Sequence, residues 1–148
     1  STPFIVLAGH SMGAATAMIE AGAKNKLGLT GADGFDAYVA MSPQGVGTIF
    51  IEDAWKGIKK PVLLLTGTKD NELNGTWETR KDAFASLPVG CKWLGVIDDA
   101  THMSFAQRSF SGKTEDLVSK TTLAFLNGVA AKNCVMPEPL KGMSLQVK

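Results

Sequence analysis

Four short, continuously apolar runs are spaced along this chain, with segments of helical spacing or turn residues between them. A strand that is apolar at every position, not at alternate ones, is typical of a sheet buried on both faces. Strands that alternate with helices imply right-handed crossovers and a parallel sheet. The sequence therefore predicts the α/β class, with about four parallel strands and flanking helices. The predicted strands are Phe4–Ala8, Asp36–Met41, Val62–Gly67 and Lys92–Ile97.

The segments between these strands favour helices. An alanine-rich helix is expected from Met12 to about Ala23, with its end near Gly22. A short helical piece is expected around Glu52–Ile58, and a longer one over Trp77–Leu87 that stops at Pro88.

The C-terminal part of the chain predicts one more helix, from about Thr114 to Ala130. Its apolar face is expected to consist of Val118, Thr122, Phe125, Leu126 and Val129. We expect one domain over residues 1–132 and an extended C-terminal tail over 133–148, which contains Pro137 and Pro139.

Composition and charge exclude several classes of function. The chain has 148 residues, of which 45% are hydrophobic and 20% charged, as in ordinary globular proteins. Lysines and arginines are scattered and the net charge is +1, which argues against a nucleic-acid or polybasic membrane surface. No apolar run approaches the roughly 18 residues that span a bilayer.

The two histidines and two cysteines form no cluster of metal-ligand spacing, so we expect neither a zinc site nor a cofactor. Cys91 and Cys134 could form one disulfide or remain two thiols.

The segment Gly9-His10-Ser11-Met12-Gly13 fits the pattern G-x-S-x-G and lies between a predicted strand and a predicted helix. That context is the one a nucleophile elbow requires. The tight turn strains the serine backbone and exposes its hydroxyl, and we expect glycine at positions 9 and 13 because side chains there would collide with strand and helix. The backbone N–H of Met12, at the start of the helix, would face a developing oxyanion.

A serine hydroxyl needs a general base, and an imidazole oriented by a carboxylate is the usual solution. Asp70 follows the third predicted strand and His102 the fourth, in the chain order Ser, Asp, His. Carboxyl ends of parallel strands meet at one edge of a sheet, so Ser11, Asp70 and His102 are predicted to form a catalytic triad. The competing carboxylates are Glu72, which lies further from the strand end, and Asp98 and Asp99, which are better suited to turns.

Other residues near the motif have ordinary structural explanations. His10 is expected to be structural or to line the pocket, not to act as a second base. Met12, Met103, Phe105 and Trp77 could contribute apolar surface near the site, although packing is an equal or better explanation for each. The segment Ser42-Pro43-Gln44-Gly45 follows a strand end and could border the pocket.

The stretches "GHSMGAA", "VAMSPQG", "PVLLLTGTKDN" and "DDATHMSF" together resemble the C-terminal half of an α/β-hydrolase, over about Phe4–Ala130. They are most similar to esterases of the dienelactone-hydrolase-like and platelet-activating-factor-acetylhydrolase-like groups. Dienelactone hydrolases proper use a cysteine nucleophile, so Ser11 favours a serine esterase. The resemblance also implies further strands before the elbow, one of whose loops supplies a second oxyanion N–H. We therefore expect a partial α/β-hydrolase fold, whose isolated chain is weakly active or inactive without the N-terminal part.

The sequence thus predicts a serine hydrolase that cleaves small-molecule carboxylic esters through an acyl-enzyme. The alternative is a non-catalytic binding or scaffold protein, because a fold does not fix a function. The acyl and alcohol groups of the substrate and the cellular compartment stay open, and thioesterase, lactonase, amidase and lipase activities are not separated by these motifs.

Overall fold

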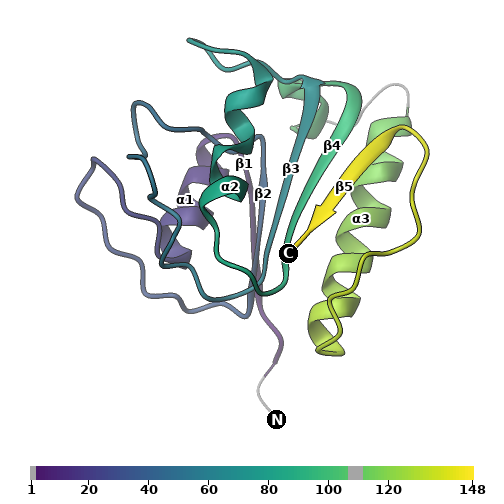
Figure 1. Ribbon diagram of the computed structural model, residues 1–148, viewed down its shortest axis with the longest axis horizontal. Helices are drawn as coiled ribbons and strands as arrows, with labels where there is room; N and C mark the ends of the chain where they lie inside the picture. The colour runs from purple at the N-terminus through teal and green to yellow at the C-terminus, as the bar shows by residue number, and fades with distance from the viewer. Residues whose placement is uncertain (1–2, 107–111) are drawn as a thin grey trace.

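The computed structural model describes residues 3–106 and 112–148, which form a mostly parallel five-stranded sheet flanked by helices (Figure 1). The strand order is the chain order, β1-β2-β3-β4-β5; β1 to β4 pair in parallel and β5 is antiparallel to β4. The predicted α/β class is confirmed at this level. The strands are β1 (Val6–His10), β2 (Ala37–Met41), β3 (Val62–Lys69), β4 (Lys92–Thr101) and β5 (Met143–Val147).

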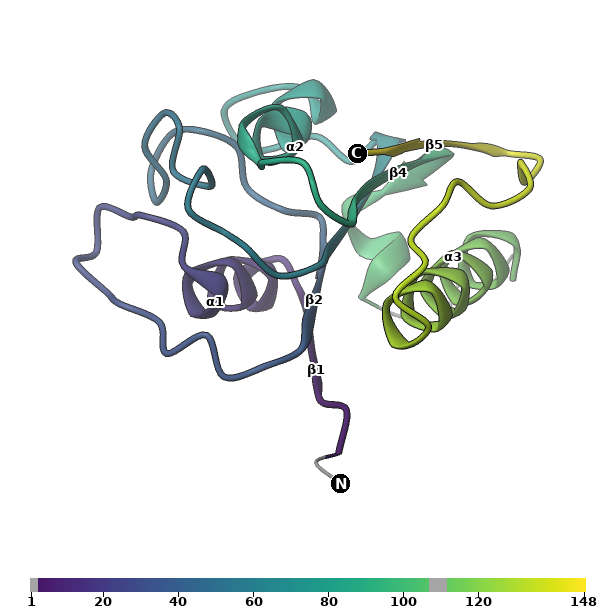
Figure 2. The same cartoon turned by 60° about the horizontal axis from the view of Figure 1, so that its bottom comes forward.

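Helices cover both faces of the sheet, with α1 (Met12–Ala21) and α2 (Asp82–Ser86) on one side and α3 (Lys113–Ala130) on the other (Figure 2). Successive strand side chains point to opposite faces, so each helical layer packs on alternate residues. In β2, Tyr38 and Ala40 belong to the core beneath α1, whereas Ala37 and Val39 pack with Phe125 of α3. This double burial is why the strands are apolar throughout.

Two of the predicted helices differ in the structure. Residues 52–58 form turns and no helix, with Asp53 at φ 62°, although Trp55 and Ile58 are buried in the core. The Trp77–Leu87 segment divides into a 3₁₀ helix η1 (Trp77–Lys81) and the short α2. Both segments bury apolar side chains without forming a continuous helix.

The C-terminal segment contributes a strand that the sequence analysis did not predict. β5 runs antiparallel to β4, with Trp93 opposite Val147 and Ile97 opposite Met143. Its apolar and polar residues alternate, which is the signal of a half-buried strand. A disulfide joins Cys91, next to β4, to Cys134, which resolves the question left open by the sequence and ties this segment to the sheet.

The buried face of α3 is also shifted from the predicted one. Thr114, Leu117, Thr121 and Phe125 are buried, while the other four residues of the predicted face are only half-buried. The C-terminal segment explains the shift, because Thr121 Oγ1 contacts Met143 Sδ at 3.2 Å and Leu117 shares a cluster with Met143.

Among the described residues, no helix combines the length and apolarity needed to cross a membrane.

β1 lies at one edge of the sheet, and within the described part of the chain β2 is its one strand neighbour. Phe4 and Ile5, just before it, are 46% and 44% exposed. An apolar edge with free backbone groups is a template for pairing with another chain. We therefore predict that a protein of these 148 residues self-associates, to be measured by sedimentation velocity over a concentration series.

The matched variant is Ala8→Lys, because Ala8 is an exposed position of β1 and an edge lysine opposes strand pairing. It should shift the distribution toward monomer without changing the thermal unfolding midpoint. A wild-type protein that stays monomeric at high concentration would refute the edge prediction.

Candidate active site

Ser11 occupies a strained turn between β1, which ends at His10, and α1, which begins at Met12. Its backbone lies at φ 58° and ψ −114°, a region that non-glycine residues rarely adopt. Hydrogen bonds hold the turn in place: Ser11 N–H donates to Met41 O at 3.0 Å, and Ser11 O accepts from Gln44 Nε2 at 2.7 Å. The Ser-Pro-Gln-Gly segment after β2 therefore supports the elbow directly.

The two motif glycines differ in what the structure requires of them. A Cβ added to Gly9 would lie 2.1 Å from the carbonyl oxygen of Gly13, so strand and helix could not approach as they do. A Cβ added to Gly13 would meet no atom of the described residues within 4 Å, apart from its chain neighbours and the backbone of its own helix. The steric explanation predicted from the sequence thus holds for Gly9 and is wrong for Gly13. No packing contact among the described residues explains the glycine at position 13.

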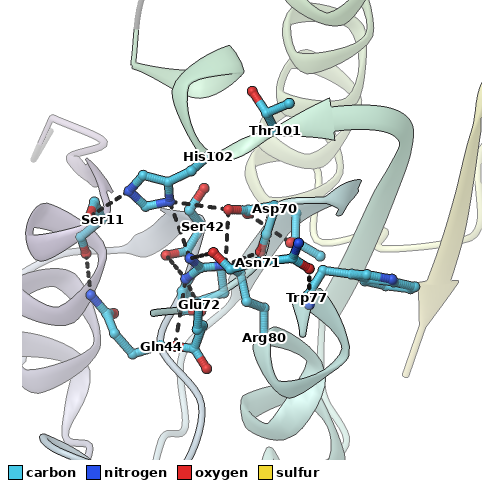
Figure 3. A network of polar contacts seen from close by, with 12 residues as sticks. Ser11, Ser42, Gln44, Asp70, Asn71, Glu72, Trp77, Arg80, Thr101 and His102 are labelled. Carbon is cyan, nitrogen blue, oxygen red and sulfur yellow. Dashed lines mark hydrogen bonds and ion pairs between the residues drawn. The ribbon is translucent and has the colours of Figure 1, made fainter. Parts of the chain in front are cut away.

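The structure brings Ser11, His102 and Asp70 into one chain of contacts (Figure 3). His102 Nε2 lies 3.0 Å from Ser11 Oγ, and His102 Nδ1 lies 3.1 Å from Asp70 Oδ1. Asp70 is fully buried, whereas the His102 side chain is 35% exposed. These distances fall within the range at which a base can accept a hydroxyl proton.

An irregularity of β4 places His102 over Asp70. Gly67 pairs with Ile97, but Lys69, two residues later, pairs with Thr101, so β4 contains two extra residues. A bulge of this kind bends a strand and redirects the side chains beyond it. Asp98 and Asp99 belong to the bulge, and the Asp99 carboxylate points outward to Lys69 at 3.4 Å. Both residues thus lie within β4, at the bulge, and the predicted role in a turn is wrong.

Hydrogen bonds fix the backbone of His102 at the end of β4. After β4, Thr101 and Ser104 form a capping box at the start of η2 (His102–Phe105). The imidazole of His10 donates its Nε2–H to the carbonyl oxygen of His102 at 2.8 Å, and the two ring centroids are 4.7 Å apart. His10 thus holds the His102 backbone, in agreement with a structural role.

Of the competing carboxylates, Glu72 is turned away from the imidazole. Its oxygens accept hydrogen bonds from the Gly45 N–H and from Thr79 Oγ1, and they lie 3.7 Å from Arg80 Nη1. Glu72 therefore ties the loop after β3 to η1. The structure favours Asp70 as the carboxylate of the site.

Arg80 is a site residue that the sequence analysis missed. Its side chain is 5% exposed, and Nε lies 3.0 Å from Asp70 Oδ1, while Nη2 lies 3.2 Å from His102 Nδ1. In the sequence, Arg80 stands in the polar stretch Trp-Glu-Thr-Arg-Lys, whose spacing indicates a solvated helix face. No local signal distinguishes a buried arginine there, because its partners come from distant segments.

The apolar residues around the motif divide between surface and core. Met12 and Met103 are 63% and 53% exposed beside Ser11 and His102, whereas Phe105 and Trp77 are half-buried against the core. Over residues 3–106 and 112–148, no group of three or more histidine, cysteine or acidic side chains is arranged to hold a metal ion.

In comparisons with known proteins, no family model matches the chain and no curated protein is significantly similar to it. The resemblance to α/β-hydrolases therefore stays a prediction.

The unequal surroundings of the two glycines give a paired prediction for stability. Gly9→Ala should lower the free energy of unfolding by about 3 kcal/mol, because backbone atoms would have to move to admit the methyl group. Gly13→Ala should be neutral or should stabilise by about 0.5–1 kcal/mol, because alanine restricts the unfolded chain and favours the helix. Urea unfolding of both variants measures the difference, and equal losses would contradict the close approach at Gly9.

Proposed function

We propose that this protein is a serine hydrolase of carboxylic esters, with Ser11 as nucleophile, His102 as general base and Asp70 as the residue that orients the imidazole. The observation that carries the proposal is the continuous contact from Ser11 Oγ through both nitrogens of His102 to the buried Asp70 carboxylate. The strained backbone of Ser11 is a second, independent support, because such strain is concentrated at functional sites.

In the first half of the proposed reaction, His102 Nε2 takes the hydroxyl proton of Ser11 as Oγ bonds to the ester carbonyl carbon. The electron pair of the carbonyl bond moves to its oxygen, and the Met12 N–H donates to this oxyanion. Met12 is the first residue of α1, whose first-turn amides have no intrahelical acceptor. When the tetrahedral species collapses, the ester C–O bond breaks, and the imidazolium returns its proton to the departing alkoxide.

In the second half, a water molecule replaces the alcohol. His102 removes a proton from the water as its oxygen bonds to the acyl carbon, and the C–Oγ bond then breaks. The imidazolium gives its proton to Ser11 Oγ, which releases the carboxylic acid and restores the site. Asp70 remains ionised throughout and accepts from the Nδ1–H of His102.

A fluorophosphonate probe tests this assignment without any knowledge of the natural substrate. The phosphonyl group should become attached to Ser11, to be located by peptide mass spectrometry. His102→Gln should slow labelling by about 10²–10⁴-fold, the usual contribution of a general base. Ser11→Ala should abolish labelling without changing the circular dichroism spectrum.

Ser86→Ala is the matched control, because Ser86 lies at the end of α2 and its hydroxyl has no hydrogen-bond partner among residues 3–106 and 112–148. It should be labelled at the wild-type rate. A folded wild-type protein that is not labelled, or one labelled equally well in the Ser11→Ala variant, would contradict the proposed function and favour a binding or scaffold role.

A further inference from the structure

The guanidinium of Arg80 directs an N–H group at the same imidazole nitrogen that faces Asp70. Arg80 Nη2 lies 3.2 Å from His102 Nδ1, and Asp70 Oδ1 lies 3.1 Å from that atom (Figure 3). The arginine side chain is 5% exposed, so it acts from behind the site and not on a bound substrate. Any influence on the reaction must therefore pass through His102 or Asp70.

Backbone carbonyl groups fix the orientation of the guanidinium. Its other N–H groups donate to four carbonyl oxygens that follow β2 and β3, and the planar fork cannot rotate without losing several of them at once. The acceptors are Asp70 O at 2.6 Å from Nε, Ser42 O and Pro43 O each at 3.1 Å from Nη1, and Asn71 O at 3.1 Å from Nη2. The remaining N–H of Nη2 is consequently held toward Nδ1.

Nδ1 of a neutral histidine can satisfy only one of its two neighbours. If Nδ1 carries the proton, it donates to Asp70, and the Arg80 N–H has no acceptor there. If the proton is on Nε2, the Nδ1 lone pair accepts from Arg80. Asp70 keeps partners in both cases, because Thr66 Oγ1 donates to Oδ2 at 2.8 Å and Arg80 Nε lies 3.0 Å from Oδ1. Each tautomer of His102 thus has a fixed partner.

The two tautomers differ in what they can do at Ser11, whose Oγ lies 3.0 Å from Nε2. With the proton on Nδ1, the Nε2 lone pair faces the hydroxyl and can take its proton. With the proton on Nε2, that nitrogen can only donate to Oγ and cannot serve as a base.

We propose that Arg80 is a positioning residue that competes with Asp70 for Nδ1 of His102 and so divides the free protein between a reactive and an unreactive tautomer. The effect of the two tautomer populations on catalysis rests on the proposed hydrolase function. The populations themselves do not depend on it.

Nitrogen-15 NMR of the histidine rings measures the populations of the two His102 tautomers directly in the protein of 148 residues. The sequence contains two histidines, so His102→Gln assigns the signals of both. At about pH 8.5, where an ordinary imidazole is neutral, the two ring nitrogens of a single tautomer resonate far apart. We expect intermediate shifts for both nitrogens of His102 in the wild-type protein. A spectrum of the pure Nδ1–H form would overturn the proposal, and this outcome needs no variant.

Two variants give opposite expectations. Arg80→Met removes the competing donor and should reduce the Nε2–H population several-fold, leaving the Nδ1–H form dominant. Asp70→Asn weakens the acceptor that holds the proton on Nδ1 and leaves the Arg80 donor in place, so it should increase the Nε2–H population. If Arg80→Met does not fold, the wild-type spectrum and Asp70→Asn still decide. Shifts of both variants in the same direction would show a general loosening of the site and would contradict the competition.

These results remain separate from the test of the hydrolase. Intermediate shifts in a protein that fluorophosphonate does not label would support the competition and refute the esterase. Labelling of Ser11 in a protein whose His102 is wholly in the Nδ1–H form would support the esterase and refute the competition.

Discussion

The buried Asp70 carboxylate is the constraint on which the arrangement of the site depends. A charge with no exposed surface is tolerated only where it is paired and fully hydrogen-bonded. Thr66 of β3, Arg80 of η1 and His102 after β4 supply those partners. The same charge therefore fixes the end of β3, buries an arginine that would otherwise face water, and holds the imidazole over Ser11.

These groups lie together at the carboxyl-terminal end of the sheet because β1, β3 and β4 run parallel. Regular strands alone do not complete the geometry: Ser11 needs a left-handed backbone, and His102 needs the two extra residues of β4. Both departures from regular structure are held by hydrogen bonds to neighbouring segments. At the elbow these involve Met41 and Gln44, and at the bulge Asp99 N–H donates to Thr68 Oγ1 of β3 at 2.8 Å. Ser11 is one of several non-glycine residues with positive φ, and it is the one that carries the proposed nucleophile.

Local patterns in the sequence were sufficient to predict the four parallel strands and to select Ser11, Asp70 and His102. Continuous apolar runs signal strands buried on both faces, and the proximity of the three polar residues follows from parallel strands whose carboxyl ends lie at the same end of the sheet. The features that were missed depend on contacts between distant segments. The buried face of α3 is set by the C-terminal segment, and the burial of Arg80 by carbonyl groups after β2 and β3. The alternation in Met143–Val147 was a local signal, but two prolines before it indicated a tail.

The most direct test of the account is to trap the covalent intermediate with a carboxylic ester. The protein is mixed with p-nitrophenyl acetate, the reaction is stopped with acid, and the acyl group is located by peptide mass spectrometry. The account predicts one acetyl group on the peptide that contains Ser11, absent in the Ser11→Ala variant and strongly reduced in His102→Gln. Acetylation confined to lysines, or unchanged in those two variants, would contradict the central claim that His102 activates Ser11.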